Sequence, residues 1–172
     1  PFDDEPVGET VYMDILNRAK KYVHIMTPYL IIDQSMITAL TFAAKRGVDV
    51  KLILPHIPDK KFAFALAKSH YKELLKAGVR IYEYTPGFVH AKIFTSDDEK
   101  AVVGTINLDY RSLYLHFECA AFLYQVEEIA EIEKDFQRTL EKCQEVTLEN
   151  RKKGTFFLRL EGWLLKWLAP LM

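Results

Sequence analysis

The stretch VHAKIFTSDDEKAVVGTIN, residues 89–107, has the pattern of a β-hairpin and organises the predicted fold. One apolar-rich run covers residues 89–95, a polar cluster occupies residues 96–100, and a second apolar run covers residues 101–108. Two such runs around a short polar cluster predict two antiparallel strands joined by a tight turn.

Four polar side chains fall on one face of this hairpin if its strands pair symmetrically about residues 98 and 99. Lys92 then lies opposite Thr105 and His90 lies opposite Asn107, because side chains alternate between the faces of a strand. The other face is apolar enough to be buried against helices. The register therefore predicts a polar patch at the open end of the hairpin.

An imidazole, an amine, a hydroxyl and an amide on one patch suit a phosphate ligand. The amine of Lys92 supplies charge, the hydroxyl and the amide donate hydrogen bonds, and the imidazole of His90 attacks phosphorus or carries a proton. No acidic cluster nearby indicates a metal. For any single residue an ordinary exposed face is the expected interpretation, whereas the four together favour a site.

A known motif matches these residues. The spacing is His90-x-Lys92, four residues, Asp97, six residues, then Gly104-Thr105-x-Asn107. It resembles the HKD motif of the phospholipase D superfamily. The continuation NLDYRSLYLHFECAAFLY at residues 107–124, with TPYLIID at residues 27–33, resembles the C-terminal catalytic half of bacterial cardiolipin synthases. The resemblance extends over nearly the whole chain.

The resemblance implies a two-step phosphatidyl transfer through a covalent phosphohistidine, with His90 as the nucleophile or its acid/base partner. Lys92 and Asn107 would hold the non-bridging phosphate oxygens, and Thr105 would assist in binding substrate. The expected reaction condenses two phosphatidylglycerol molecules to cardiolipin and glycerol, without metal or cofactor.

Two acidic residues are assigned supporting roles. Asp97 belongs to the motif, but it lies at the start of the turn, where Asp commonly bonds backbone amides, so a structural role is expected. Glu118 is the one charged residue of an apolar run and needs a partner. That partner is either a Lys or Arg, or a ring nitrogen of His90 whose tautomer Glu118 would fix. The resemblance supports the second interpretation.

Other polar residues have weaker assignments. Arg111 either contacts phosphate or forms an ion pair with Asp109, and the ion pair is the expected outcome from the sequence alone. His56 follows a predicted strand, where open α/β sheets bind ligands. It could touch a substrate headgroup, although loop scaffolding is favoured. His24 is expected to be a core histidine rather than a ligand.

Periodicity and chain breakers predict alternating helices and strands. Helices are expected over residues 8–21, 34–46, 60–77 and 126–146, and strands over residues 22–26, 48–54, 79–84 and 117–124, besides the hairpin. This order predicts an α/β fold: a single phospholipase D-like domain with a mixed, largely parallel sheet flanked by helices on both faces.

The domain is expected to cover residues 1–150, and a basic, amphipathic C-terminal helix is expected over residues 151–172. That helix either lies in a membrane interface or packs on protein. The 172-residue chain has a formal net charge of −1, which disfavours nucleic acid as a partner. Cys119 and Cys143 are expected to be buried or half-buried free thiols in a reducing compartment.

The chain carries one HKD motif, whereas the enzymes it resembles carry two. It begins with Pro1 and is expected to be a fragment. The implied partners are an N-terminal half with a second motif, or a second copy of the chain as a homodimer. The expected location is the cell membrane surface, with transmembrane segments in the N-terminal part. The alternatives are a homodimeric, metal-independent nuclease of the same superfamily and a non-catalytic membrane-docking module.

Overall fold

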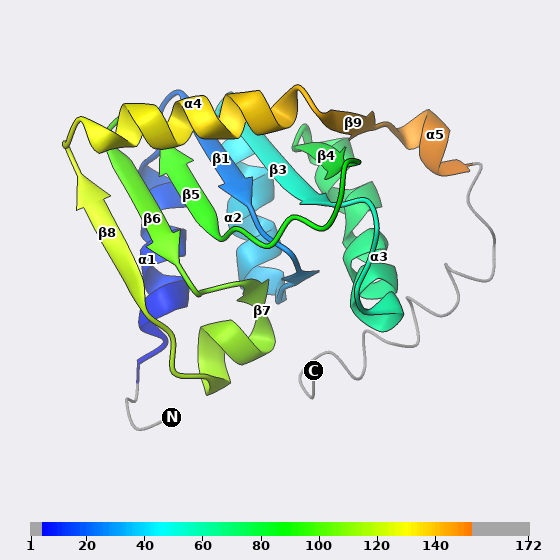
Figure 1. Ribbon diagram of the computed structural model, residues 1–172, viewed down its shortest axis with the longest axis horizontal. Helices are drawn as coiled ribbons and strands as arrows, with labels where there is room; N and C mark the ends of the chain where they lie inside the picture. The colour runs from blue at the N-terminus through cyan, green and yellow to red at the C-terminus, as the bar shows by residue number, and fades with distance from the viewer. Residues whose placement is uncertain (1–4, 153–172) are drawn as a thin grey trace.

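The computed structural model describes residues 5–152, which form a mixed seven-stranded sheet with helices on both faces (Figure 1). The strand order across the sheet is β8 (Ala120–Tyr124), β6 (Lys100–Gly104), β5 (Ile93–Ser96), β1 (Tyr22–Met26), β3 (Asp49–Pro55), β4 (Arg80–Tyr84) and β9 (Cys143–Val146). The central strands β1, β3 and β4 are parallel, and the remaining neighbours pair antiparallel. The predicted α/β fold is confirmed.

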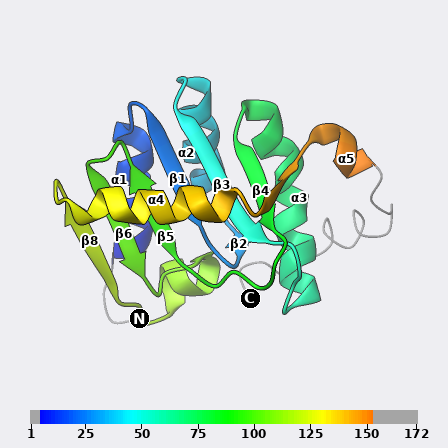
Figure 2. The ribbon, with the colours of Figure 1, turned by 45° about the horizontal axis from the view of Figure 1, so that its top comes forward.

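Three helices cover one face of the sheet and a fourth crosses the other (Figure 2). The first three are α1 (Val7–Arg18), α2 (Gln34–Lys45) and α3 (Lys61–Ala77); the fourth is α4 (Glu128–Leu140). The short helix α5 (Leu148–Lys152) ends the described chain. None of the helices within residues 5–152 is long and apolar enough to cross a membrane. The predicted C-terminal helix at residues 151–172 lies mostly outside the described residues.

Local sequence signals set the helix boundaries. The side chain of Asp33 accepts a hydrogen bond from the backbone N–H of Met36 at 2.8 Å and caps α2. Gly78 ends α3 with φ of +98°, a conformation that glycine adopts without steric cost. The core lies mainly between α1–α3 and the sheet, and a smaller cluster around Phe136 lies beneath α4.

The hairpin forms where predicted, but its register differs by one residue. Ile93 pairs with Val103 and Ser96 pairs with Lys100, so residues 97–99 form a three-residue turn. The expected pairing was symmetric about residues 98 and 99. The strands are also shorter, because β5 begins at Ile93 and β6 ends at Gly104. The predicted opposed pairs at the polar end are therefore wrong, and those residues lie in the segments just beyond the strands.

Two further boundaries differ because of long-range strand pairing. The predicted helix over residues 126–146 ends at Leu140, and Cys143–Val146 forms strand β9 against the open edge of β4. A free strand edge offers a full row of hydrogen-bond partners, which overrides local helical periodicity. The strand predicted over residues 117–124 begins only at Ala120.

The buried histidine beneath α4 is part of a polar network. The Nδ1 atom of His24 lies 2.7 Å from one carboxylate oxygen of Glu133, and the other oxygen accepts a hydrogen bond from the hydroxyl of Thr95. The Nε2 atom of His24 is buried and has no hydrogen-bond partner among the described residues. The core placement predicted for His24 is thus confirmed. Cys143 is half-buried as expected, whereas Cys119 is exposed.

One edge of the sheet gathers the segments that carry the candidate site. The carboxyl ends of β1, β3 and β6 meet the amino ends of β5 and β8 there, as their pairing requires. A second sheet pairs β2 (Leu30–Ile31) with β7 (Leu108–Asp109), and the π-helical turn η1 (Arg111–Leu115) follows β7 (Figure 1). The small sheet fixes the chain that leaves the hairpin.

Candidate active site

The centre of the candidate site is the contact between His90 and Lys92, in the segment that leads into β5. The Nζ atom of Lys92 lies 3.1 Å from each ring nitrogen of His90 and donates to the backbone carbonyl of His90 at 2.7 Å. His90 is exposed and Lys92 is half-buried. Burial lowers the pKa of Lys92 below its ordinary value, while the carboxylates of Glu118 and Asp109 oppose that shift.

Asn107 is held at the same sheet edge by the turn that follows it. Its Nδ2 atom donates to the hydroxyl of Ser112 at 3.1 Å, and the buried carboxylate of Asp109 accepts from the backbone N–H of Ser112 at 2.8 Å. The Oδ1 atom of Asn107 is buried and has no hydrogen-bond partner among the described residues. A buried amide with unused hydrogen-bonding capacity is suited to a ligand.

Thr105 and Glu118 form a second pair. The hydroxyl of Thr105 donates to the carboxylate of Glu118 and accepts from the backbone N–H of Cys119 at 2.9 Å. The other oxygen of Glu118 lies 3.9 Å from Nδ1 of His116, which is itself in contact with Arg111. Thus Glu118 is linked to Thr105 and His116.

The predicted hydrogen bond between Glu118 and His90 does not occur among the described residues. Glu118 instead lies close enough to Lys92 to influence its charge. The ion pair expected between Arg111 and Asp109 is also wrong. Arg111 Nε donates to Nε2 of His116 at 3.0 Å, while Asp109 is occupied by the backbone of η1.

Gly104 allows β8 to approach the end of β6 closely. A Cβ atom at this position would lie 2.3 Å from the carbonyl oxygen of Cys119 and 2.4 Å from Cα of Ala120. Both are backbone atoms, so a side chain here would push the strands apart. The glycine of the motif therefore brings the Thr105 segment against the Glu118 segment.

Asp97 lies at the opposite end of β5 from His90. Its carboxylate accepts hydrogen bonds from the backbone N–H groups of Lys20, Lys21 and Tyr22 at 2.7, 2.8 and 2.9 Å. Burial tends to raise its pKa, but these backbone bonds prevail and lower the pKa below its ordinary value. The structural role predicted for Asp97 is therefore what its contacts provide.

His56 lies just beyond β3, on the same sheet edge as His90. Its Nδ1 atom is 2.8 Å from the buried carboxylate of Glu83, which also accepts from the hydroxyl of Tyr71 at 3.2 Å. His56 is thus anchored by a buried carboxylate, as loop scaffolding requires, and its ring remains partly exposed.

One protein-family model matches most of the chain. The family model described as the phospholipase D-like domain of cardiolipin synthase matches residues 12–140, which include the hairpin and α4. The chain belongs to this phospholipase D-like family.

Relatives of this phospholipase D-like domain are longer than the chain. It is 59% identical to an uncharacterized protein of Streptococcus mutans over 100% of this chain and 37% of that protein. It is 42% identical to a cardiolipin synthase of Clostridium perfringens over 94% of this chain and 34% of the relative. It is 37% identical to a cardiolipin synthase of Halalkalibacterium halodurans over 96% of this chain and 33% of the relative. The chain thus spans about a third of the relatives it matches.

Solved structures share the phospholipase D-like fold at low sequence identity. The family member Nuc of Salmonella typhimurium has a TM-score of 0.71 at 16% identity, covering 80% of this chain and 90% of that chain. A phosphatidylserine synthase of Haemophilus influenzae has a TM-score of 0.73 at 16% identity, covering 95% of this chain and 44% of that chain. These likenesses support the fold.

Sequence reasoning missed several residues that support the phospholipase D-like site. Ser112 and Asp109 position Asn107, and the spacing of an Asp three residues before a Ser is a turn signal that could have identified the pair. Phe88 was also missed, although its ring lies 5.8 Å from the ring of His90 between centroids. No local pattern singles out Phe88, because its importance comes from the three-dimensional contact.

Proposed function

We propose that the protein containing this chain is a phosphatidyltransferase that condenses two phosphatidylglycerol molecules to cardiolipin and glycerol. The observation that carries this proposal is the His90–Lys92 contact at a sheet edge that also holds Asn107, Thr105 and Glu118. The longer relatives named cardiolipin synthase, at 37–42% identity, favour this reaction over other phosphodiester chemistry.

In the first step, Nε2 of His90 attacks the phosphodiester phosphorus of the donor lipid. A phosphorus–nitrogen bond forms, the bond from phosphorus to the headgroup oxygen breaks, and the leaving alkoxide takes a proton from a general acid. Lys92 neutralises the non-bridging oxygens as charge redistributes, and the amide of Asn107 donates to them. The Nδ2 atom of Asn107 donates to Ser112 in this structure. When the amide turns over, the hydroxyl of Ser112 donates to Oδ1 instead, and the NH₂ group is free to donate to the phosphate.

In the second step, a hydroxyl of another phosphatidylglycerol attacks the phosphohistidine and returns Nε2 to its free state. The group that donated the first proton now removes one from that hydroxyl. The single HKD motif of this chain leaves this group to a second motif. It comes from another part of the full-length protein or from a second copy of the chain. In this mechanism His90 is the nucleophile, and the histidine of the second motif is the general acid and base.

Glu118 and Thr105 act on the charge of the site. The carboxylate of Glu118 opposes deprotonation of Lys92, and Thr105 holds that carboxylate in place. Arg111 contacts His116, which in turn lies beside the carboxylate of Glu118. The guanidinium of Arg111 is thus available to an anionic substrate. His56 lies farther along the sheet edge and would contact the headgroup side of the substrate.

Residues 1–150 are proposed to be the catalytic unit, and residues 151–172 an amphipathic segment that meets the membrane surface. This places the domain at the periphery of the cell membrane, where its lipid substrate is found.

The direct test is turnover of phosphatidylglycerol by the full-length protein in mixed micelles, with His90→Ala beside Glu99→Ala. The first variant should lose at least about 1,000-fold in rate, because no other group replaces a covalent nucleophile. Glu99 is an exposed residue of the same hairpin and should have no effect. Acid-labile incorporation of labelled phosphate into wild-type protein supports the intermediate; full activity of His90→Ala overturns the proposal.

A homodimeric phosphodiesterase is the second candidate, because the fold covers 90% of the Nuc chain. The same samples distinguish it. Cleavage of DNA in the presence of a chelator, without cardiolipin formation, would favour the phosphodiesterase. An inactive dimer that still binds vesicles would favour a docking module.

A further inference from the structure

Large apolar side chains are exposed where β3 connects to α3, at the sheet edge that holds the candidate active site. The exposed fraction is 54% for Ile57, in the connecting loop, and 64% for Phe62, in the first turn of α3. Phe88, in the segment that leads to His90, is 38% exposed. Residues 57–62 together with Phe88 are called the loop patch. Exposed apolar side chains that cluster in this way mark an interaction surface.

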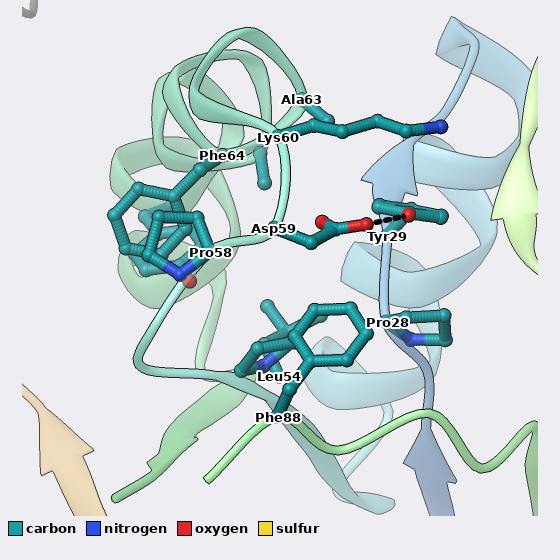
Figure 3. A pocket seen from close by; sticks show the side chains of 12 residues that line it. Pro28, Tyr29, Leu54, Pro58, Asp59, Lys60, Ala63, Phe64 and Phe88 are labelled. Atoms are coloured by element: carbon teal, nitrogen blue, oxygen red, sulfur yellow. Dashed lines mark hydrogen bonds between the residues drawn. The ribbon is translucent and has the colours of Figure 1, made fainter.

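The loop patch borders the candidate active site. Pro58, Lys60 and Phe88 line one narrow hollow at the carboxyl end of β3, so the loop and the Phe88 segment lie side by side (Figure 3). The ring of Phe88 also lies 5.8 Å from the ring of His90 between centroids. A surface that meets the loop patch therefore lies next to His90.

Two lysines accompany the apolar side chains. Lys60 and Lys61 are exposed, and neither forms an ion pair within residues 5–152. The loop has one carboxylate, that of Asp59, which accepts a hydrogen bond from the hydroxyl of Tyr29 at 2.5 Å. Two ammonium groups thus outnumber one carboxylate, and the loop patch combines apolar side chains with a net positive charge.

A second exposed apolar surface differs in its charge. It follows β8, where Phe122 and Tyr124 are 50% and 53% exposed. Residues 115–126 contain no lysine or arginine, and Glu127 and Glu128 come directly after them. An anionic membrane repels carboxylates and attracts lysines. The charges therefore select the loop patch, and not the β8 surface, as the face that suits an anionic bilayer.

The composition of the loop patch fits the boundary between headgroups and acyl chains. Aromatic and aliphatic side chains enter a bilayer at that level, while ammonium groups stay beside the lipid phosphates. Phosphatidylglycerol, the lipid of the proposed reaction, is itself anionic. The substrate and the surface that carries it would thus attract the same edge of the domain.

We propose that the loop patch is a membrane-docking surface that inserts Ile57 and Phe62 into the interface of an anionic bilayer. Lys60 and Lys61 bind the lipid phosphates beside them. The assignment rests on the proposed phosphatidyl transfer, and it adds a contact within the catalytic unit to the one proposed for the C-terminal segment. Docking holds the sheet edge against the bilayer, so a headgroup reaches His90 while its acyl chains stay in the membrane.

Tryptophan fluorescence tests insertion in the full-length protein, reconstituted in vesicles of phosphatidylglycerol and phosphatidylcholine. Phe62→Trp places the probe in the loop patch, and lipids brominated in their acyl chains should quench the added emission at least about twofold. Phe42→Trp is the matched control. Phe42 is 53% exposed but lies near the end of α2, which precedes the amino end of β3 on the opposite sheet edge. Its emission should not be quenched.

Three results would overturn the proposal. The first is equal quenching at both positions, or none at residue 62. The second is unchanged quenching in vesicles of phosphatidylcholine alone, because the lysines would then have no role. The third is shielding of residue 62 from aqueous iodide without lipid, which would assign the loop patch to a contact with another part of the protein.

Turnover by the full-length protein gives a second measurement. Ile57→Ser combined with Phe62→Ser should raise the apparent KM for phosphatidylglycerol in vesicles about 10-fold, because two half-exposed side chains lose their apolar contact with the bilayer. Lys60→Gln combined with Lys61→Gln should raise it about 30-fold, since each lysine at an anionic surface contributes about fivefold. The rate with dihexanoyl phosphatidylglycerol dissolved as monomers should stay within about twofold, because no bilayer is present.

Equal losses on dissolved and vesicle lipid would contradict a docking role, since they would show that the loop patch acts on the reaction itself. The fluorescence measurement does not depend on turnover. Failure of the proposed transfer is therefore seen separately, as undiminished lipid turnover by His90→Ala.

Discussion

The two ends of the β5–β6 hairpin use their polar groups in opposite ways. At the turn, the carboxylate of Asp97 accepts from the backbone N–H groups of residues 20–22, which lead into β1, and Asp98 accepts from the hydroxyl of Tyr22. At the open end, Asn107 keeps a buried oxygen without a hydrogen-bond partner in the described chain, and Lys92 has no ion pair there. The turn satisfies its hydrogen bonds internally, while the open end leaves capacity for a ligand.

This difference separates stability from chemistry within one motif. Groups whose hydrogen bonds are complete hold the fold together, and substituting them should change the free energy of unfolding. Groups with unused capacity contribute little to folding, and substituting them should change the reaction. Variants at each end can test whether this separation holds.

After His90→Ala, the largest effect is expected for Lys92→Ala. Loss of the cation that faces the phosphate oxygens should lower the rate of phosphatidylglycerol turnover by about 10²–10³-fold. The urea midpoint should barely change, since this half-buried amine has no ion pair in the described part of the chain. Lys100→Ala, in the same hairpin next to the turn, is the control and should keep full activity. A large loss of stability in Lys92→Ala would break the separation.

A substitution at Gly104, at the open end of the hairpin, should lower both stability and activity. The Cβ of Gly104→Ala would lie 2.3 Å from a backbone oxygen of Cys119, so β6 and β8 must move apart. We expect a loss of about 1–3 kcal/mol in the free energy of unfolding. Displacement of Thr105 from Glu118 should lower activity as well. Gly87→Ala is matched, because its Cβ would meet nothing within 4 Å; an equal effect of both substitutions would contradict the close-approach explanation.

Asp97→Asn should change stability alone. Asn tolerates the positive φ of 57° at this position, so the substitution isolates the charge on the three backbone hydrogen bonds. Because the site is partly solvated, we expect a loss of about 1–2 kcal/mol in urea unfolding. The rate per folded molecule should match wild type. A rate loss in a fully folded sample would instead connect Asp97 to the chemistry.

The sequence predicted the fold class and most elements because local signals carry them. Asp33 and Gly78 marked helix ends that the structure keeps, and alternation of apolar runs marked β1, β3 and β4. The hairpin register was wrong because it depends on the turn. Positive φ angles at Asp97 and Asp98 make a three-residue turn, and the resulting one-residue shift moves the side chains of one strand to the opposite face relative to its partner.

The sequence predicts which residues form the candidate site, but not the contacts between them. The HKD spacing singled out His90, Lys92 and Asn107, since those positions are close in sequence. The partner of Glu118 could not be read in this way. Its carboxylate is reached by Thr105 across the β6–β8 pairing and by His116 from the end of η1, and neither contact has a local signature.

The smallest effect, and a direct test of the turn end, is the pH dependence of stability. The pKa of Asp97 is lower in the folded chain than its ordinary value, despite the opposing effect of burial. Its contribution is therefore complete above the unfolded pKa of about 3.9 and is lost as pH falls through the folded pKa below it. The urea midpoints of wild type and Asp97→Asn should differ at pH 7 and converge as the pH falls below the unfolded pKa of Asp97. Glu133, whose pKa is also lowered, is present in both proteins, so its effect cancels in the difference. A constant difference across that range would mean that the neutral amide, and not the loss of charge, is responsible.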